Sequence, residues 1–212
     1  MKQALILGCS HAAGSEITSK WDSRDESDTL KSFPAQIARR QGYNVNNLAI
    51  PGGSNDAMFR IFNEYTSSVD LVIAVWSGPT RTEIFYDDKW PQFCGGGLNH
   101  ITELDEYVRQ WVLFQANEQW GIVNKTKNII ALNALAQARN VPVINIDAFW
   151  PVEQYVWPEY IHWPVPETFC NWALHNKYPA TEWGHFDITA HTNFATYILE
   201  NLELPKTTLQ NY

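Results

Sequence analysis

The chain has 212 residues, of which 45% are hydrophobic and 14% aromatic. This composition is typical of a folded globular protein, because a disordered chain would have fewer apolar and more charged residues. The formal net charge is −8 and the 15 Lys and Arg are scattered, so no basic face for nucleic acid is expected. Cys9, Cys94 and Cys170 follow no metal-ligand spacing, which favours reduced thiols over disulfides and predicts no metal or other cofactor.

The organisation of the chain indicates one domain. The first apolar run, residues 4–7, is too short for a secretory signal core or a membrane span. We therefore expect a cytoplasmic protein with no membrane partner. No repeat, low-complexity tract or linker divides the sequence, so a single domain over residues 1–212 is expected. The sequence gives no indication of the oligomeric state.

Strand-like and helix-like patterns alternate along the chain. In order, they predict a strand over 4–8, a helix over 32–40, a strand over 43–50, a helix over 54–65, a strand over 70–75, one bent helix or two over 104–138, a strand over 141–146 and a last helix over 187–202. This alternation predicts an α/β fold, with a mostly parallel sheet that has helices on both faces. In such folds the site forms outside the carboxyl ends of the strands, so the loops that follow the strands are examined first.

The loop after the first strand carries the candidate nucleophile. Ser10 follows the strand directly and precedes a turn with Gly14 into a helical segment, where backbone N–H groups converge. Such groups stabilise an oxyanion, which suits a serine nucleophile. A serine that only caps a helix is an equally good explanation of this loop alone.

Two further loops carry polar groups of the same kind. In the second loop, a free N–H of Gly52 or Gly53 would face the same oxyanion, although a plain strand-to-helix turn explains two glycines more simply. Near the end of the chain, Glu182 stands three residues before His185. A carboxylate there can accept a hydrogen bond from one ring N–H and leave the other ring nitrogen as a base. The alternative is that Glu182 and His185 form an ordinary pair on the surface. Asp187 is expected to cap the last helix.

Together these blocks resemble a known family. Gly-Cys-Ser after the first strand, Asn-Leu-Ala-Ile-Pro-Gly after the second and Glu-Trp-Gly-His before the last helix are similar, in order and position, to the SGNH (GDSL-like) hydrolases. The resemblance spans the chain and implies a three-layer, flavodoxin-like doubly wound parallel sheet. It implies Ser10 as nucleophile, His185 as general base, Glu182 as its orienting acid, and the N–H groups of Ser10 and Gly52 in the oxyanion hole. The Gly-Cys-Ser-His and Pro-Gly-Gly-Ser-Asn turns also resemble small SGNH-like proteins of tailed bacteriophages, which would associate the protein with a virion.

Two positions depart from the family pattern. The family's acid is Asp, and the longer Glu182 changes its reach but not its chemistry. In the third block Pro79 replaces the oxyanion-hole asparagine and offers neither a backbone N–H nor a side-chain donor. Loss of one such donor costs about 3 kcal/mol of transition-state stabilisation. Arg81 is the preferred substitute because it is a charged donor, unless it pairs with Glu83 or Asp87 and only holds the loop. Other donors near this position are Ser77, Thr80 and Asn55.

Aromatic residues are dense over residues 149–183, a segment too irregular for a helix or strand pattern. A second insertion covers about 85–99. We expect both to border the site, because stacked aromatics suit sugar rings or planar acyl groups, although a hydrophobic cluster under a long loop explains most of the aromatic residues slightly better. The candidate substrate-binding residues are Asn55, Trp76 and Trp183.

Two hypotheses follow from these observations. The first is a serine esterase that cleaves a small acyl ester, such as an O-acetyl group on a carbohydrate or another small molecule. The second is a weak or inert SGNH-fold protein that serves as a binding or structural component, for example of a phage particle; the missing asparagine favours it. A flavodoxin-like nucleotide binder is disfavoured, because no Gly-x-Gly-x-x-Gly follows the first strand.

Overall fold

The computed structural model describes residues 1–18, 25–94, 102–114, 117–149 and 157–202. The strands are β1 (Gln3–Gly8), β2 (Asn44–Asn47), β3 (Leu71–Trp76), β4 (Arg81–Glu83), β5 (Gln92–Cys94) and β6 (Val143–Asp147). The helices are α1 (Ser10–Ala13), α2 (Glu26–Lys31), α3 (Phe33–Arg40), α4 (Asn55–Glu64), the 3-10 turn η1 (Thr102–Leu104), α5 (Asp105–Phe114), α6 (Glu118–Ala138), α7 (Phe169–His175) and α8 (Ile188–Asn201).

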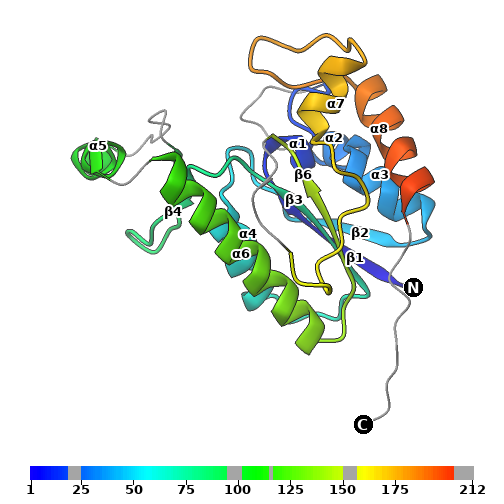
Figure 1. The fold of residues 1–212 in the computed structure, drawn as a ribbon, viewed down its shortest axis with the longest axis horizontal. Helices are drawn as coiled ribbons and strands as arrows, with labels where there is room; N and C mark the ends of the chain where they lie inside the picture. The colour runs from blue at the N-terminus through cyan, green and yellow to red at the C-terminus, as the bar shows by residue number, and fades with distance from the viewer. Residues whose placement is uncertain (19–24, 95–101, 115–116, 150–156, 203–212) are drawn as a thin grey trace.

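Four parallel strands form the central sheet in the order β2-β1-β3-β6. Leu5 of β1 lies opposite Val72 of β3, and Trp76 at the end of β3 lies opposite Asp147 at the end of β6. Figure 1 shows helices on both sides of this sheet, which confirms the predicted α/β fold class. Because all four strands run the same way, the loops that follow them meet at one edge.

Neighbouring side chains of the strands point into two separate cores, as expected for parallel strands that are covered on both faces. Ile6 and Ile73 belong to the core under α3, α7 and α8, whereas Leu5 and Val72 belong to the core under α4 and α6. The first core is rich in aromatic contacts: the ring centroids of Phe169 lie about 5 Å from those of Phe33 and Phe194. These contacts pack α3, α7 and α8 against one another, and α8 directly follows His185.

The helix α6 buries polar as well as apolar side chains. Asn133 donates to Asn145 of β6 and accepts from the same amide, and Asn145 also accepts from the indole of Trp76 at 3.0 Å. Lys125 is fully buried against the carboxylate of Asp147. Since buried polar groups are stable only when they are paired, this side of α6 is fixed in one position relative to β6.

The structure defines the long helical stretch and parts of the two insertions more closely than the sequence does. The stretch over 104–138 forms two helices, α5 and α6, one of the two arrangements expected. The segment 149–183 is not wholly irregular: Thr168 caps α7 through the N–H of Asn171, so helix capping gives a short helix there. The 85–99 insertion starts with a hairpin, because β4 and β5 pair antiparallel around a two-residue turn at Asp87 and Asp88. The remaining parts of these insertions, 95–99 and 150–156, lie outside the described residues.

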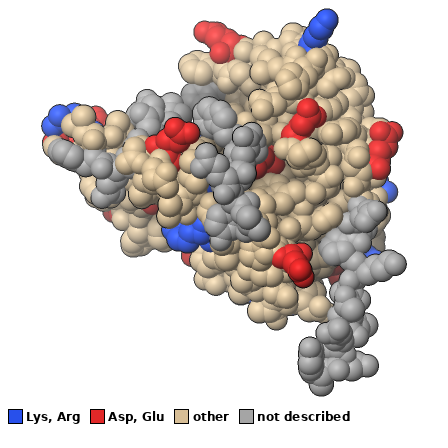
Figure 2. All heavy atoms as spheres, viewed as in Figure 1, with Lys and Arg blue, Asp and Glu red and all other residues tan. Residues whose placement is uncertain are grey.

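On the face shown in Figure 2, Lys and Arg appear as separate groups among acidic ones. This distribution agrees with the net charge of −8 over the whole sequence. Among the described residues, none of the helices combines the length and apolarity that a membrane crossing requires.

Candidate active site

Ser10 begins α1 directly after β1, at the edge where the strands end. The turn into α1 is tight: a Cβ on Gly8 would lie 2.7 Å from the Cβ of Ala12 and 2.8 Å from the carbonyl oxygen of Val75. Only glycine fits at that position, so the close packing of β1, β3 and α1 fixes the place of Ser10. Ser10 is buried at this position.

The structure brings Ser10 and His185 together across 175 residues of sequence. Ser10 Oγ and His185 Nε2 are 2.8 Å apart, within hydrogen-bond distance. His185 lies just before α8, and Asp187 caps that helix by accepting from the N–H of Ala190, as expected. The contact is the one that a general base needs in order to take the proton from a serine hydroxyl.

The acid next to His185 is Glu16, and the prediction of Glu182 is wrong. Glu16 Oε2 lies 2.6 Å from His185 Nδ1, on the opposite side of the ring from Ser10. Glu182 is exposed, in a turn where the N–H of Gly184 donates to the carbonyl of Thr181. That turn directs the Glu182 side chain to solvent, whereas Glu16 comes from the loop that also carries Ser10. The order Ser10–His185–Glu16 is that of a nucleophile, a base and an orienting acid.

The conformation of the loop after α1 places Glu16 there. Gly14 and Glu16 both have positive φ values, +76° and +61°, which turn the chain back toward the C-terminal part of the molecule. Thr18 then anchors the loop, because its N–H donates to the buried carboxylate of Asp28 at 2.9 Å. A left-handed non-glycine residue is uncommon and costs free energy, and it is found mainly at functional or tightly held positions.

The surroundings of His185 keep its imidazole neutral near pH 7. Burial lowers the pKa of His185 below its ordinary value, and the positive charge of Arg81 lowers it further, while Glu16 opposes both. His11 packs edge-on against His185, with ring centroids 4.9 Å apart, and burial lowers the pKa of His11 well below its usual range. Both shifts favour the neutral imidazole of His185, which is the form that a general base requires.

The loops that follow β2 and β3 flank the serine. Gly53 donates its N–H to Ile50 at 2.7 Å, so of the two glycines Gly52 is the remaining candidate donor to an oxyanion. Pro79, where the family has asparagine, packs against α6: a Cβ on Gly121 would lie 3.0 Å from the Pro79 backbone. Pro79 is thus a packing residue of this loop and contributes no donor.

Arg81 brings a positive charge to the same place. Its guanidinium stacks over the ring of Phe149 at 5.1 Å, and Phe149 in turn contacts His11. Its Nη1 is buried and has no hydrogen-bond partner among the described residues. The alternative pairing with Glu83 is not formed, since both oxygens of Glu83 accept from Arg60, at 2.7 and 2.9 Å. A buried charged donor without a partner is costly unless a ligand satisfies it.

Two of the three predicted substrate-binding residues are wrong. Asn55 is fully buried and braces two loops, because it accepts from the N–H of Ser77 at 2.8 Å and donates to the carbonyl of Gly78. Trp76 is fully buried in the core beneath α4 and α6, with its indole N–H bound to Asn145. Both were assigned from their position near a loop, which does not show the direction of a side chain. Trp183 is 57% exposed and stays a candidate.

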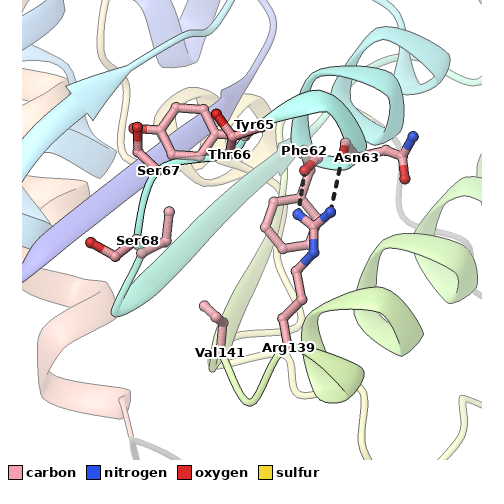
Figure 3. Close-up of a pocket in the computed structure, with 9 residues that line it drawn as sticks. Phe62, Asn63, Tyr65, Thr66, Ser67, Ser68, Arg139 and Val141 are labelled. Carbon is pink, nitrogen blue, oxygen red and sulfur yellow. Dashed lines mark hydrogen bonds between the residues drawn. The ribbon is translucent and has the colours of Figure 1, made fainter.

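A hollow bounded by described residues lies away from Ser10 and His185. It has a volume of about 510 Å³ and lies between the end of α4 and the start of β3, with Tyr65, Ser68 and Val141 on its walls (Figure 3). Arg139 donates hydrogen bonds there to the carbonyls of Phe62 and Asn63, at 2.6 and 2.9 Å. The hollow therefore lies where β3 begins, at the opposite end of the strands from Ser10. No cluster of His, Cys, Asp or Glu suited to a metal ion occurs within the described residues.

The sequence reasoning missed Glu16, Thr181 and His11 as members of the site. Thr181 Oγ1 donates to Glu16 Oε2 at 2.6 Å. His11 follows the serine directly, which was a visible signal, but its contact with His185 depends on tertiary packing. The only signal for Glu16 in the sequence is its position six residues after Ser10, and no local pattern links it to a histidine.

Comparison with known proteins identifies the fold. No family model and no curated protein matches the sequence. Among solved structures, a carbohydrate esterase family 2 enzyme with a carbohydrate-binding domain from Corynascus thermopiles (Myceliophthora fergusii) aligns over 94% of this chain with a TM-score of 0.52 and 9% identity. The fold is that of the SGNH-type hydrolases.

Other esterases of that kind align more loosely. An acetyl xylan esterase from the rumen bacterium Butyrivibrio proteoclasticus has a TM-score of 0.49 at 11% identity, and a family 2 carbohydrate esterase from Clostridium thermocellum, solved with cellohexaose, has a TM-score of 0.42 at 14% identity. The protein covers 62% to 66% of the length of these three chains. At these identities the likeness describes the fold.

Proposed function

We propose that the protein is a serine hydrolase of the SGNH type that cleaves a small acyl ester. The observation that carries the proposal is the arrangement of three side chains: Ser10 Oγ lies within hydrogen-bond distance of His185 Nε2, and His185 Nδ1 lies within hydrogen-bond distance of Glu16. In the proposed reaction Ser10 attacks the ester carbonyl while His185 takes its proton. His185 then returns the proton to the leaving alcohol, and water activated by His185 releases the acid from the acyl-enzyme.

The proposed oxyanion hole consists of the backbone N–H groups of Ser10 and Gly52 together with the guanidinium of Arg81. Pro79 cannot supply the side-chain donor of the family pattern. Arg81 lies after β3 at the same edge, and its buried Nη1 has no partner in the described parts of the chain. A charged donor in a buried site stabilises a developing negative charge more strongly than a neutral amide does.

The proposed substrate is an acyl ester on a carbohydrate, with an O-acetyl group as the first candidate. Two observations support it: the structural neighbours are described as carbohydrate esterases, and Trp183 is exposed two residues before His185. An exposed indole two residues from the proposed base offers a face on which a sugar ring can stack.

Turnover of a short-chain chromogenic ester tests this proposal. The wild-type protein should hydrolyse it, Ser10→Ala should reduce the rate to background, and Arg81→Ala should lower kcat and kcat/KM together by roughly 10²-fold, as expected for loss of an oxyanion donor. An Arg81→Ala variant that melts at a lower temperature but keeps its kcat would reject the donor role. The matched control is Arg109→Ala, because Arg109 is exposed and pairs with Glu106 on the surface of α5.

The competing hypothesis is a catalytically inert SGNH-fold protein with a binding or structural role, such as in a phage particle. The observation that favours it is Pro79, which packs on Gly121 in place of an oxyanion-hole side chain. If the wild type shows no Ser10-dependent turnover on acetyl or other short-chain esters, including acetylated sugars, this hypothesis becomes the better one.

A further inference from the structure

Thr181 forms hydrogen bonds with the backbone of His185 and with the carboxylate of Glu16. Its backbone N–H donates to the carbonyl of His185 at 2.8 Å, and its hydroxyl accepts from the backbone N–H of His185 at 3.1 Å. The same hydroxyl donates to Glu16 Oε2 at 2.6 Å. One carboxylate oxygen therefore receives two donors, the hydroxyl of Thr181 and the ring Nδ1–H of His185.

These contacts form a closed ring of hydrogen bonds. It runs from the N–H of His185 to Thr181 Oγ1, from there to Glu16 Oε2, and back to Nδ1 of the same histidine. This cycle links the backbone and the imidazole of His185 to the same carboxylate oxygen of Glu16, one of them through Thr181. The imidazole therefore cannot rotate away from Ser10 without breaking a charge-assisted hydrogen bond. The ring also sets the tautomer, because Nδ1 carries the proton that faces Glu16 and Nε2 is left as the acceptor.

The geometry points to Thr181 as a positioning residue of the proposed Ser10–His185–Glu16 site. It acts through Glu16 and His185 and does not need to touch the substrate. The inference rests on the proposed function, since it assigns the role of Thr181 within that site. The hydroxyl of Thr181, and not only the backbone of the turn, holds the Glu16 carboxylate in line with the imidazole.

The comparison of Thr181→Val with Thr181→Ser tests the hydroxyl alone. Val has nearly the shape of Thr but neither donates nor accepts, so it removes two hydrogen bonds and leaves the two backbone contacts of residue 181. We expect Thr181→Val to lower kcat by roughly 10- to 100-fold, with little change in KM, because one hydrogen bond to a charged group is lost from the machinery. Thr181→Ser should restore most of the rate. Equal kcat in the wild type and Thr181→Val would overturn the inference.

A second readout is independent of turnover. A proton shared between an imidazole and a carboxylate at short distance gives a far-downfield proton NMR resonance, which Glu16→Gln should remove. We expect this resonance to be lost or shifted in Thr181→Val and retained in Thr181→Ser. If it persists unchanged in Thr181→Val, Thr181 is only a structural residue of the turn.

The two readouts separate the inference from the proposed function. Absence of Ser10-dependent turnover in the wild type, with the NMR response as expected, would reject the esterase and keep Thr181 as the residue that positions Glu16 and His185. If Thr181→Val does not fold, Thr181→Ala gives the same comparison with Thr181→Ser. The matched control is Thr189→Val, an exposed threonine in the first turn of α8, which should change neither kcat nor the resonance.

Discussion

At the scale of single residues, the acid of the site comes from an unexpected part of the chain. The resemblance to SGNH hydrolases places the acid three residues before the histidine, and Glu182 occupies that position. In the structure Glu16 takes its place, 169 residues away from His185. Glu16 follows Ser10 by six residues, so the proposed nucleophile and acid come from one segment after β1 and both contact His185.

Substitution of the two acids distinguishes their roles. Glu16→Gln keeps the size of the side chain but removes the charge that holds the Nδ1–H tautomer of His185. We expect kcat to fall by roughly 10²-fold or more. Glu182→Gln, on an exposed side chain, should leave kcat within a factor of two of the wild type. Steady-state kinetics on the same ester measure both, and a larger loss in Glu182→Gln than in Glu16→Gln would contradict the assignment.

The sequence was informative where a local pattern decides the outcome. Ser10 after β1 and His185 before α8 follow from strand and helix boundaries, and so does the cap at Asp187. It was not informative where the backbone turns unexpectedly: the positive φ of Glu16 has no signature in the residue type. For Trp76 the run of aliphatic residues predicted the strand correctly but did not show that the last side chain points into the core.

At the scale of secondary-structure elements, α6 is held by polar pairs as well as by apolar packing. Lys125 is fully buried and contacts the carboxylate of Asp147, at the end of β6. Burial raises the pKa of Asp147, and the nearby ammonium opposes that rise. A buried ion pair of this kind adds little net stability over an apolar pair, but it is costly to break from one side.

Removal of one partner of this pair should destabilise the fold. We expect Lys125→Met to lower the free energy of unfolding by about 3 to 5 kcal/mol, because Asp147 is then left charged and buried. Lowering the pH should recover part of the loss, since the unpaired Asp147 can be protonated. Urea denaturation at pH 7 and pH 5 measures both effects. Lys127→Met is the matched control: Lys127 lies two residues further along α6, is 63% exposed and should cost little.

At the scale of the whole molecule, buried neutral imidazoles make the fold sensitive to acid. His191 of α8 is fully buried, and its Nδ1 accepts from the N–H of Phe33 at 3.1 Å. Burial lowers the pKa of His191 to about 3, and burial also lowers the pKa of His11. These groups join α1, α3 and α8 in one core, so their protonation affects the packing of the layer that carries His185.

Stability should therefore fall with pH in a defined window. The unfolded chain binds a proton on residue 191 near pH 6.5, but the folded chain does so only near pH 3. Between these values the unfolded state holds more protons, so the contribution of His191 is fully present above pH 6.5 and is lost as the pH falls toward 3, by about 5 kcal/mol at most.

Chemical denaturation at a series of pH values tests this window. His191→Asn keeps an acceptor for Phe33 but does not titrate, so its free energy of unfolding should depend less steeply on pH between 6.5 and 3 than that of the wild type. The exposed His175 provides the control, because His175→Asn should leave the slope unchanged. Identical slopes in the wild type and His191→Asn would show that the buried imidazole does not govern acid sensitivity.

The site joins residues that are far apart in the sequence, and this separation determines when Ser10 can become reactive during synthesis. The proposed nucleophile and acid, Ser10 and Glu16, leave the ribosome before the proposed base, because His185 follows Ser10 by 175 residues. Until His185 has been made and α8 has docked against α3, the serine has no base and remains an ordinary hydroxyl. A chain that stops before His185 would thus be unreactive, and reactivity of Ser10 toward a serine-directed phosphonate probe would report that the segments of Ser10 and His185 have come together.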